Sequence, residues 1–157
     1  MTQSQKYLTD GSLGKLAKWL RLMGFDTIVY PRTINREILN FAYSEKRIVL
    51  TRRVDMVKRR FSGQIYLIEG KETEDQLKEI VRKISLKIEK DKIFSICLKC
   101  NERLSPVPKE EVFDLVPSYV FANCDNFNRC PNCKRIYWKG THERNALQFL
   151  EKLGNLS

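Results

Sequence analysis

Four of the five cysteines in this 157-residue chain form two pairs of one pattern, Cys97-Leu-Lys-Cys100 and Cys130-Pro-Asn-Cys133. Between the two pairs lie 29 residues. Thiolates delivered as two C-x2-C hooks are the typical ligand set of a closed, tetrahedral Zn²⁺ site with a structural role. We therefore predict one structural zinc ion bound by Cys97, Cys100, Cys130 and Cys133.

Disulfides and an iron–sulfur centre are the alternatives to zinc. Disulfides need an oxidising compartment, and the polar start of the chain, residues 1–6, does not resemble a signal peptide. Iron–sulfur centres usually space their cysteines differently. Zinc is therefore favoured, and we expect the odd thiol, Cys124, to be a small packed side chain rather than a fifth ligand.

The residue after each hook bears on the geometry of the turn. Asn101 follows the first hook, and asparagine tolerates the left-handed backbone that such hooks often need. Lys134 follows the second hook, where glycine is more usual, so we expect a less ideal turn there.

Three carboxylates, Asp10, Glu37 and Asp55, form a second group with possible chemistry. Carboxylate oxygens hold Mg²⁺ or Mn²⁺, and two such ions can support in-line hydrolysis of a phosphodiester. Each carboxylate also has a structural alternative. Asp10 can cap a helix together with Ser12, Glu37 can favour a helix dipole, and Asp55 can cap a helix or pair with a neighbouring arginine.

The elements that would position these side chains alternate along the first half of the chain. Apolar and β-branched runs predict strands at residues 6–9, 26–30, 47–51 and 64–68, and helical spacing predicts helices within residues 12–24, 34–42, 55–60 and 73–84. Thr73 to Gln76 resembles a capping box for the last of these helices. The alternation predicts an α/β fold, a parallel sheet flanked by helices.

Parallel sheets place their active sites outside the carboxyl ends of the strands. Asp10 directly follows the first strand, Glu37 opens the helix after the second, and Asp55 follows the third by four residues. We therefore expect the three carboxylates to converge on one edge of the sheet.

A charged stretch at residues 87–92 predicts a domain boundary. We expect an α/β domain over residues 1–92 and a small zinc ribbon with a C-terminal helix over residues 93–157.

The chain is strongly basic, with a formal net charge of +10 and a pI of about 9.5. Residues 1–92 carry 20 Lys and Arg against 12 Asp and Glu, and residues 93–157 carry 9 against 7. This balance points to a polyanionic partner. No apolar run is long enough to span a membrane, and we expect a cytoplasmic protein.

Four segments together resemble the Mut-seven C-terminal RNase domain family: LTDGSLGKLAKWLRLMGFDT, RIVLTRR, CLKCNERLSPV and CPNCKRIYWKGTH. The resemblance covers roughly residues 7–145. It implies a PIN-like nuclease fold with a C-terminal zinc ribbon of four cysteines, and RNA cleavage that depends on a divalent metal.

The match differs from the family at two positions of the acidic site. Asp10 corresponds to the family's first acidic residue. Asn35 and Glu37 stand where the family tends to have an acidic pair, and Arg53 replaces the carboxylate of the family's L-T-R-D motif. Asp55, two residues further on, is a possible substitute. A cation inside a magnesium site opposes metal binding by direct repulsion.

Basic and aromatic residues supply a predicted RNA-binding surface. Its members are Lys15, Lys18, Arg21, Arg52, Arg53, Lys58, Arg59, Arg60, Trp138 and His142. Cations contact phosphates, and exposed aromatic rings stack on unpaired bases. The alternatives are a solvated basic helix face and, for Trp138, packing within the protein.

These features lead to a hypothesis and two alternatives. The hypothesis is a ribonuclease in which Asp10 and Glu37, with Asp55, hold Mg²⁺ or Mn²⁺. The first alternative is a non-catalytic RNA-binding protein on a degenerate PIN-like fold, supported by Arg53. The second is an adaptor that binds a protein partner through its zinc ribbon.

Overall fold

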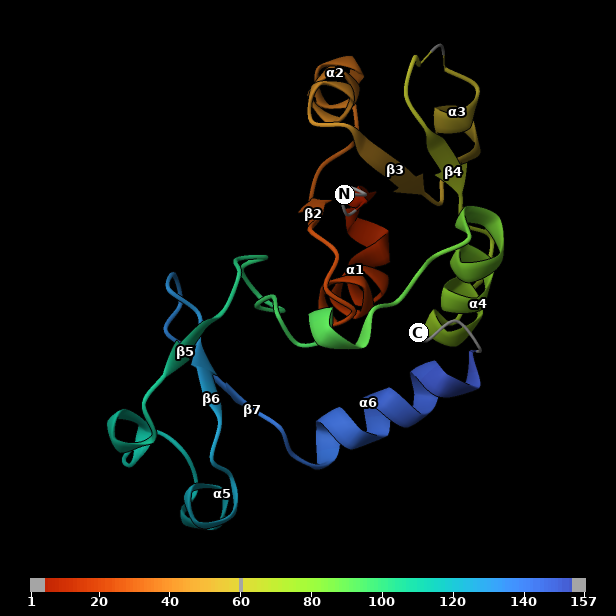
Figure 1. Cartoon of the computed structure of the whole chain (residues 1–157). Helices are drawn as coiled ribbons and strands as arrows, with labels where there is room; N and C mark the ends of the chain where they lie inside the picture. Colours follow the sequence, from red (N-terminus) through yellow and green to blue (C-terminus); the bar gives the residue numbers. More distant parts are fainter. Residues whose placement is uncertain (1–4, 60, 154–157) are drawn as a thin grey trace.

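The computed structural model describes residues 5–59 and 61–153, and its larger part is a four-stranded parallel sheet. The strand order is β2-β1-β3-β4, with β1 Lys6–Asp10, β2 Thr27–Tyr30, β3 Arg47–Thr51 and β4 Ile65–Leu67. Helices lie on both sides of the sheet (Figure 1). The predicted α/β fold class, a parallel sheet flanked by helices, is confirmed.

The two faces of the sheet carry separate cores, because side chains alternate between the faces along a strand. Tyr7 of β1 lies in one core and its neighbour Leu8 in the other. The helices and 3-10 turns of this region are η1 (Gly11–Leu13), α1 (Gly14–Leu22), α2 (Arg36–Ser44), α3 (Val54–Val57), α4 (Thr73–Ile84) and η2 (Lys90–Lys92). α1 and α4 pack into the core that contains Tyr7, while α2 and α3 pack into the core that contains Leu8.

The start of α4 differs from the prediction. Thr73 is the first helical residue rather than the cap, and Glu72 at the cap position makes no side-chain hydrogen bond to the helix. Gln76 instead donates from Nε2 to the carbonyl oxygen of Gly70, over 2.9 Å. The predicted capping box is therefore wrong.

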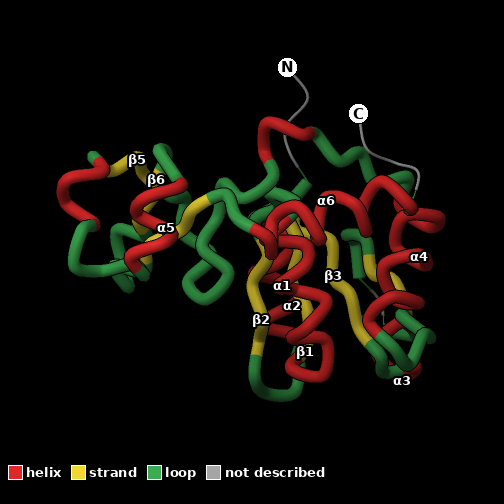
Figure 2. The backbone as a smooth tube through the Cα atoms, turned by 90° about the horizontal axis from the view of Figure 1, so that it is seen from below, coloured by secondary structure: helices red, strands yellow, loops and turns green. Residues whose placement is uncertain are grey.

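A smaller module follows the parallel sheet, with three antiparallel strands in the order β5-β6-β7. Its elements are β5 (Ser105–Val107), η3 (Lys109–Val112), α5 (Ser118–Asn123), β6 (Phe127–Arg129) and β7 (Ile136–Trp138). Val112, Val116, Val120 and Phe127 form its own apolar core, against which Trp138 packs. Figures 1 and 2 both show this module beside the parallel sheet rather than over one of its faces.

The last helix, α6 (Thr141–Lys152), leaves the small module and packs against the larger part of the chain (Figures 1 and 2). Leu150 is 0 % exposed and belongs to the same core as Leu16 and Leu20 of α1. The rings of Phe149 and Trp19 lie 5.0 Å apart between centroids. The contacts of α6 thus cross the boundary that we propose between residues 92 and 93. In the described part of the chain, no helix combines the length and apolar character needed to cross a bilayer.

Replacing Leu150 with alanine tests whether α6 belongs to the core of the parallel sheet. We expect Leu150→Ala to lower the free energy of unfolding by about 2–5 kcal/mol, because it leaves a cavity in a packed core. Urea unfolding measures this loss. The matched control is Leu115→Ala. Because Leu115 is 58 % exposed, this variant should lose little unfolding free energy. Equal effects of the two substitutions would contradict the packing of α6.

Candidate metal centre and pocket

The four cysteines of the two hooks meet in one cluster. The sulfur atoms of Cys97, Cys100, Cys130 and Cys133 all lie within 4.8 Å of one another. Tetrahedral Zn–S bonds of about 2.3 Å require sulfur atoms about 3.8 Å apart, and Cys97 and Cys133 are separated by 3.7 Å between Sγ atoms. The donor set therefore fits a zinc ion. Cys124 is not a member of the cluster, in agreement with the prediction.

Both hooks have the backbone turn that places two thiols on one metal. The amide of Cys100 donates to Sγ of Cys97 over 3.4 Å, and the amide of Cys133 donates to Sγ of Cys130 over 3.5 Å. Asn101 and Lys134 both lie in the left-handed region, at φ 63° and 65°. Lys134 thus adopts the turn conformation despite its side chain.

Hydrogen bonds prepare Cys97 to be a ligand. Burial alone raises the pKa of its thiol, but the Tyr137 hydroxyl 3.2 Å away and nearby backbone amides outweigh burial and lower this pKa to about 6. Burial and the contact with Cys97 in turn raise the pKa of Tyr137 to about 12. Near neutral pH the thiolate form is therefore favoured, with a protonated tyrosine as its donor.

The first hook is fastened to the edge strand β2 by the side chain of Asn101. Its Oδ1 accepts from the amide of Thr27 over 2.9 Å, and its Nδ2 donates to Oδ1 of Asp26 over 2.6 Å. Arg47 of β3 binds the same Asp26 oxygen over 3.0 Å. Burial would raise the pKa of Asp26, but the bonds from Arg47 and Asn101 and the charge of Arg47 together lower it. No local pattern in the sequence indicates this junction.

Arg21 of α1 is buried, whereas the sequence predicted it on the RNA-binding surface. It is only 9 % exposed, and its guanidinium donates to the carbonyl oxygens of Leu98 (2.8 Å), Lys99 (3.4 Å) and Thr27 (2.9 Å). All three acceptors belong to the first hook or to β2. We therefore leave Arg21 out of the RNA-binding surface.

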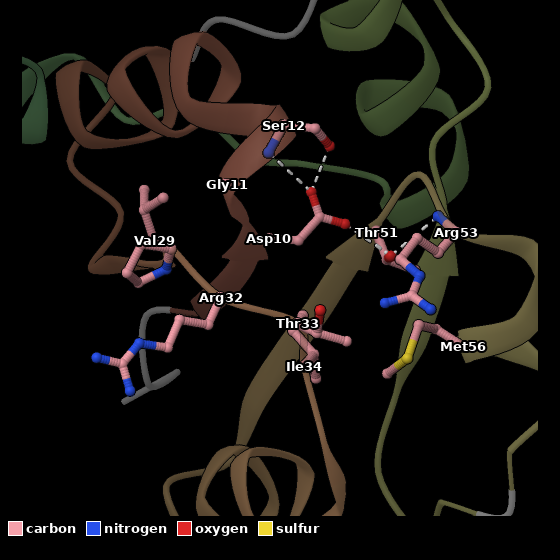
Figure 3. A pocket seen from close by; sticks show the side chains of 11 residues that line it. Asp10, Gly11, Ser12, Val29, Arg32, Thr33, Ile34, Thr51, Arg53 and Met56 are labelled. Carbon is pink, nitrogen blue, oxygen red and sulfur yellow. Dashed lines mark hydrogen bonds between the residues drawn. The ribbon is translucent and has the colours of Figure 1, made fainter.

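A pocket of about 610 Å³ lies at the carboxyl ends of β1 and β3, where the α/β fold predicts an active site. Figure 3 shows Asp10 between Ser12 and Thr51, with Arg32 and Arg53 on opposite sides of it. The lining residues include two cations and one carboxylate, which belongs to Asp10. No motif in the sequence places Arg32 at this site.

Asp10 is held firmly in this pocket, and it is 7 % exposed. Its Oδ1 accepts hydrogen bonds from the amide and the hydroxyl of Ser12, so that Asp10 caps η1. Its Oδ2 accepts from the Thr51 hydroxyl (2.8 Å) and the Arg52 amide (3.2 Å). The capping alternative is therefore present, and it coexists with a position in the pocket.

The other two predicted carboxylates do not join Asp10 in one cluster. Among the described residues, the four cysteines are the only group of three or more acidic, cysteine or histidine side chains with ligand atoms within 4.8 Å of one another. Glu37 lies exposed in the first turn of α2, outside the pocket lining. Asp55 is paired with Arg53 through bonds of 2.9 and 3.2 Å. As metal ligands, Glu37 and Asp55 remain predictions.

The remaining residues of the predicted RNA-binding surface differ in exposure. Those with exposed side chains are Lys15, Lys18, Arg53, Lys58, Arg59 and His142. Arg52 is half-buried and donates to the carbonyl oxygen of Gly70. Trp138 packs on the core of the small module, as the packing alternative expected. Arg60 lies outside the described residues.

Comparison with known proteins identifies one family. The family model of the Mut7-C RNAse domain matches residues 5–150, which include both the parallel sheet and the four cysteines. No curated protein and no solved structure gives a significant match. The predicted resemblance is confirmed over nearly the whole chain.

Metal analysis of the purified protein tests the zinc centre. We expect about one zinc per chain, because four ligands close one tetrahedral site. Cys97→Ser should lose the metal and destabilise the small module, since structural zinc contributes folding energy. The control is Cys124→Ser, which should keep its zinc. Full zinc content and unchanged stability in Cys97→Ser would refute the assignment.

Proposed function

The chain belongs to the Mut7-C RNase domain family, and on this premise we propose that it is a divalent-metal-dependent ribonuclease whose active site is the Asp10 pocket. Family membership supports a nuclease-like or RNA-related role. The metal dependence, the site residues and a cytoplasmic location are our proposal. So is a division into a PIN-like domain of residues 1–92 and a zinc-ribbon domain of residues 93–157.

The position of Asp10 is the observation that supports this function most directly. A nearly buried carboxylate at the carboxyl end of a central parallel strand, in a pocket, has the surroundings typical of a catalytic carboxylate in an open α/β sheet. Its four hydrogen bonds fix its orientation before any ligand arrives.

The donor set of the pocket fits one hydrated ion better than two. Mg²⁺ usually keeps several waters and is held by one or two carboxylates together with substrate phosphates. Asp10 supplies one such carboxylate, whereas a two-ion site needs further carboxylates that do not line the pocket. A bound Mg²⁺ or Mn²⁺ would supply a polarised phosphate and an activated water.

The chain's own residues perform the remaining tasks in this proposal. Ser12 and Thr51 hold the carboxylate of Asp10 in place. Arg32 and Arg53 line the same pocket and attract the phosphates of an RNA strand. The exposed pair between Arg53 and Asp55 is weak, because such pairs are screened by solvent, so Arg53 can exchange Asp55 for a phosphate.

A specific observation favours the second candidate, a non-catalytic RNA-binding protein. The charged groups that line the pocket are one carboxylate with four hydrogen bonds and two arginines. This balance favours an anion over a cation. On this proposal the pocket binds an RNA phosphate without metal.

Replacing Asp10 with asparagine separates the two candidates. For a ribonuclease, we expect Asp10→Asn to reduce Mn²⁺- or Mg²⁺-dependent cleavage of labelled single-stranded RNA by about 100-fold or more. Loss of a residue that only supports a metal ligand already lowers metal affinity or activity by about 10–100-fold. Asp114→Asn, at an exposed position in the small module, is the control. Circular dichroism verifies that the variant is folded.

Two outcomes would reject the ribonuclease proposal. The first is cleavage that survives Asp10→Asn at the wild-type rate. The second is that the wild-type protein binds the RNA in the presence of a chelator but does not cleave it when Mn²⁺ or Mg²⁺ is added. This second outcome supports the non-catalytic RNA-binding protein.

The salt dependence of RNA binding tests the basic residues. On either candidate, Arg53→Gln should lower the slope of log affinity against log salt by about 0.7, because one phosphate contact with a single strand is lost. Lys152→Gln, at the far end of α6, should leave the slope unchanged. Identical slopes for wild type and Arg53→Gln would remove Arg53 from the RNA-binding surface.

A further inference from the structure

A positive charge near the buried side of the zinc centre would stabilise it. A Zn²⁺ ion with four thiolates carries a formal charge of about −2. Cys97 and Cys130 are buried, so water screens this charge poorly on their side of the cluster. A buried charge without a partner is strongly unfavourable, which favours a cation at this position.

Arg21 lies at this position. Its Nη1 donates to the carbonyl oxygens of Leu98 and Lys99, the two residues between the ligands Cys97 and Cys100. Its Nε donates to Thr27, which fixes the guanidinium against β2. Burial lowers the pKa of Arg21, while Cys97, the carboxylate of Asp26, Cys100 and Tyr137 act in the opposite direction. Arginine keeps its charge in such surroundings.

The other described cations next to the ligands are exposed or paired with a carboxylate. Arg129, which precedes Cys130, is half-buried and its guanidinium lies 3.7 Å from the carboxylate of Glu111. Lys99 lies within the first hook, and Lys134 and Arg135 follow the second, all three with exposed side chains. Charges in contact with water are screened and stabilise the cluster little. Arg21, from a helix more than 70 residues away in the sequence, is the buried cation of the first hook.

We propose that Arg21 is a positioning residue of the zinc centre, which supplies the buried countercharge of the thiolate cluster and holds the first hook in its metal-binding conformation. This role is independent of RNA binding or cleavage. It also explains why a basic residue of α1 is directed into the protein while Lys15 and Lys18 of the same helix are exposed.

Competition for zinc with a chromogenic chelator tests this role in the full-length protein. We expect Arg21→Gln, which keeps a donor but loses the charge, to weaken zinc binding by roughly 10- to 100-fold, as removal of outer partners of a metal site does. Arg21→Lys keeps the charge and should lie closer to wild type than to Arg21→Gln. Lys18→Gln, an exposed position on the same helix, is the matched control and should match wild type.

The order of the variants decides the outcome. Zinc affinity of Arg21→Gln equal to that of Lys18→Gln would overturn the proposal. Equal losses in Arg21→Gln and Arg21→Lys would overturn the countercharge role, because the hydrogen bonds of the guanidinium rather than its charge would then matter. If circular dichroism shows that Arg21→Gln does not fold with excess zinc, Arg21→Lys decides alone. Affinity within about tenfold of wild type supports the countercharge, and a larger loss contradicts it.

Discussion

The side-chain amide of Asn101 is the contact through which the zinc hook and the parallel sheet become one structure. β2 is an edge strand, and Asn101 binds the amide of Thr27 at its start. Asp26, the residue before β2, is shared between Asn101 and Arg47 of β3. A buried polar group left without a partner costs about 1–3 kcal/mol. The hook therefore provides the hydrogen-bond acceptor for the Thr27 amide at the start of β2, and β2 in turn fixes the orientation of the hook.

This junction extends to the pocket through the register of the sheet. Tyr30, at the end of β2, lies opposite Asp10 in the parallel ladder, and Val29 of β2 lines the pocket. One short strand thus carries the hook contact at its start and a wall of the pocket at its end. α6 adds a second connection, because Leu150 returns from the small module to the core beside α1. β2 therefore connects the zinc ribbon with the pocket.

The sequence was sufficient to predict those strands and metal ligands that follow from a local pattern of residues. Apolar and β-branched runs located the four parallel strands, and the two C-x2-C hooks located the metal ligands. The capping box at Thr73 was wrong, since Gln76 binds Gly70 outside the helix, which a short motif cannot anticipate. The links from Arg21 and Asn101 join residues 74 to 78 positions apart, and no local signal pairs them. Arg32 is likewise placed in the pocket by the fold rather than by a motif.

Amide hydrogen exchange of residues 27–30, with zinc bound and after chelation, tests most directly whether the hook supports the sheet. If Asn101 fastens β2, removal of zinc should release the first hook and lower the protection of Thr27 and the rest of β2, while the central strand β3 stays protected. Unchanged protection of β2, together with lost protection at residues 97–101, would show that the sheet stands without the hook and would contradict the account.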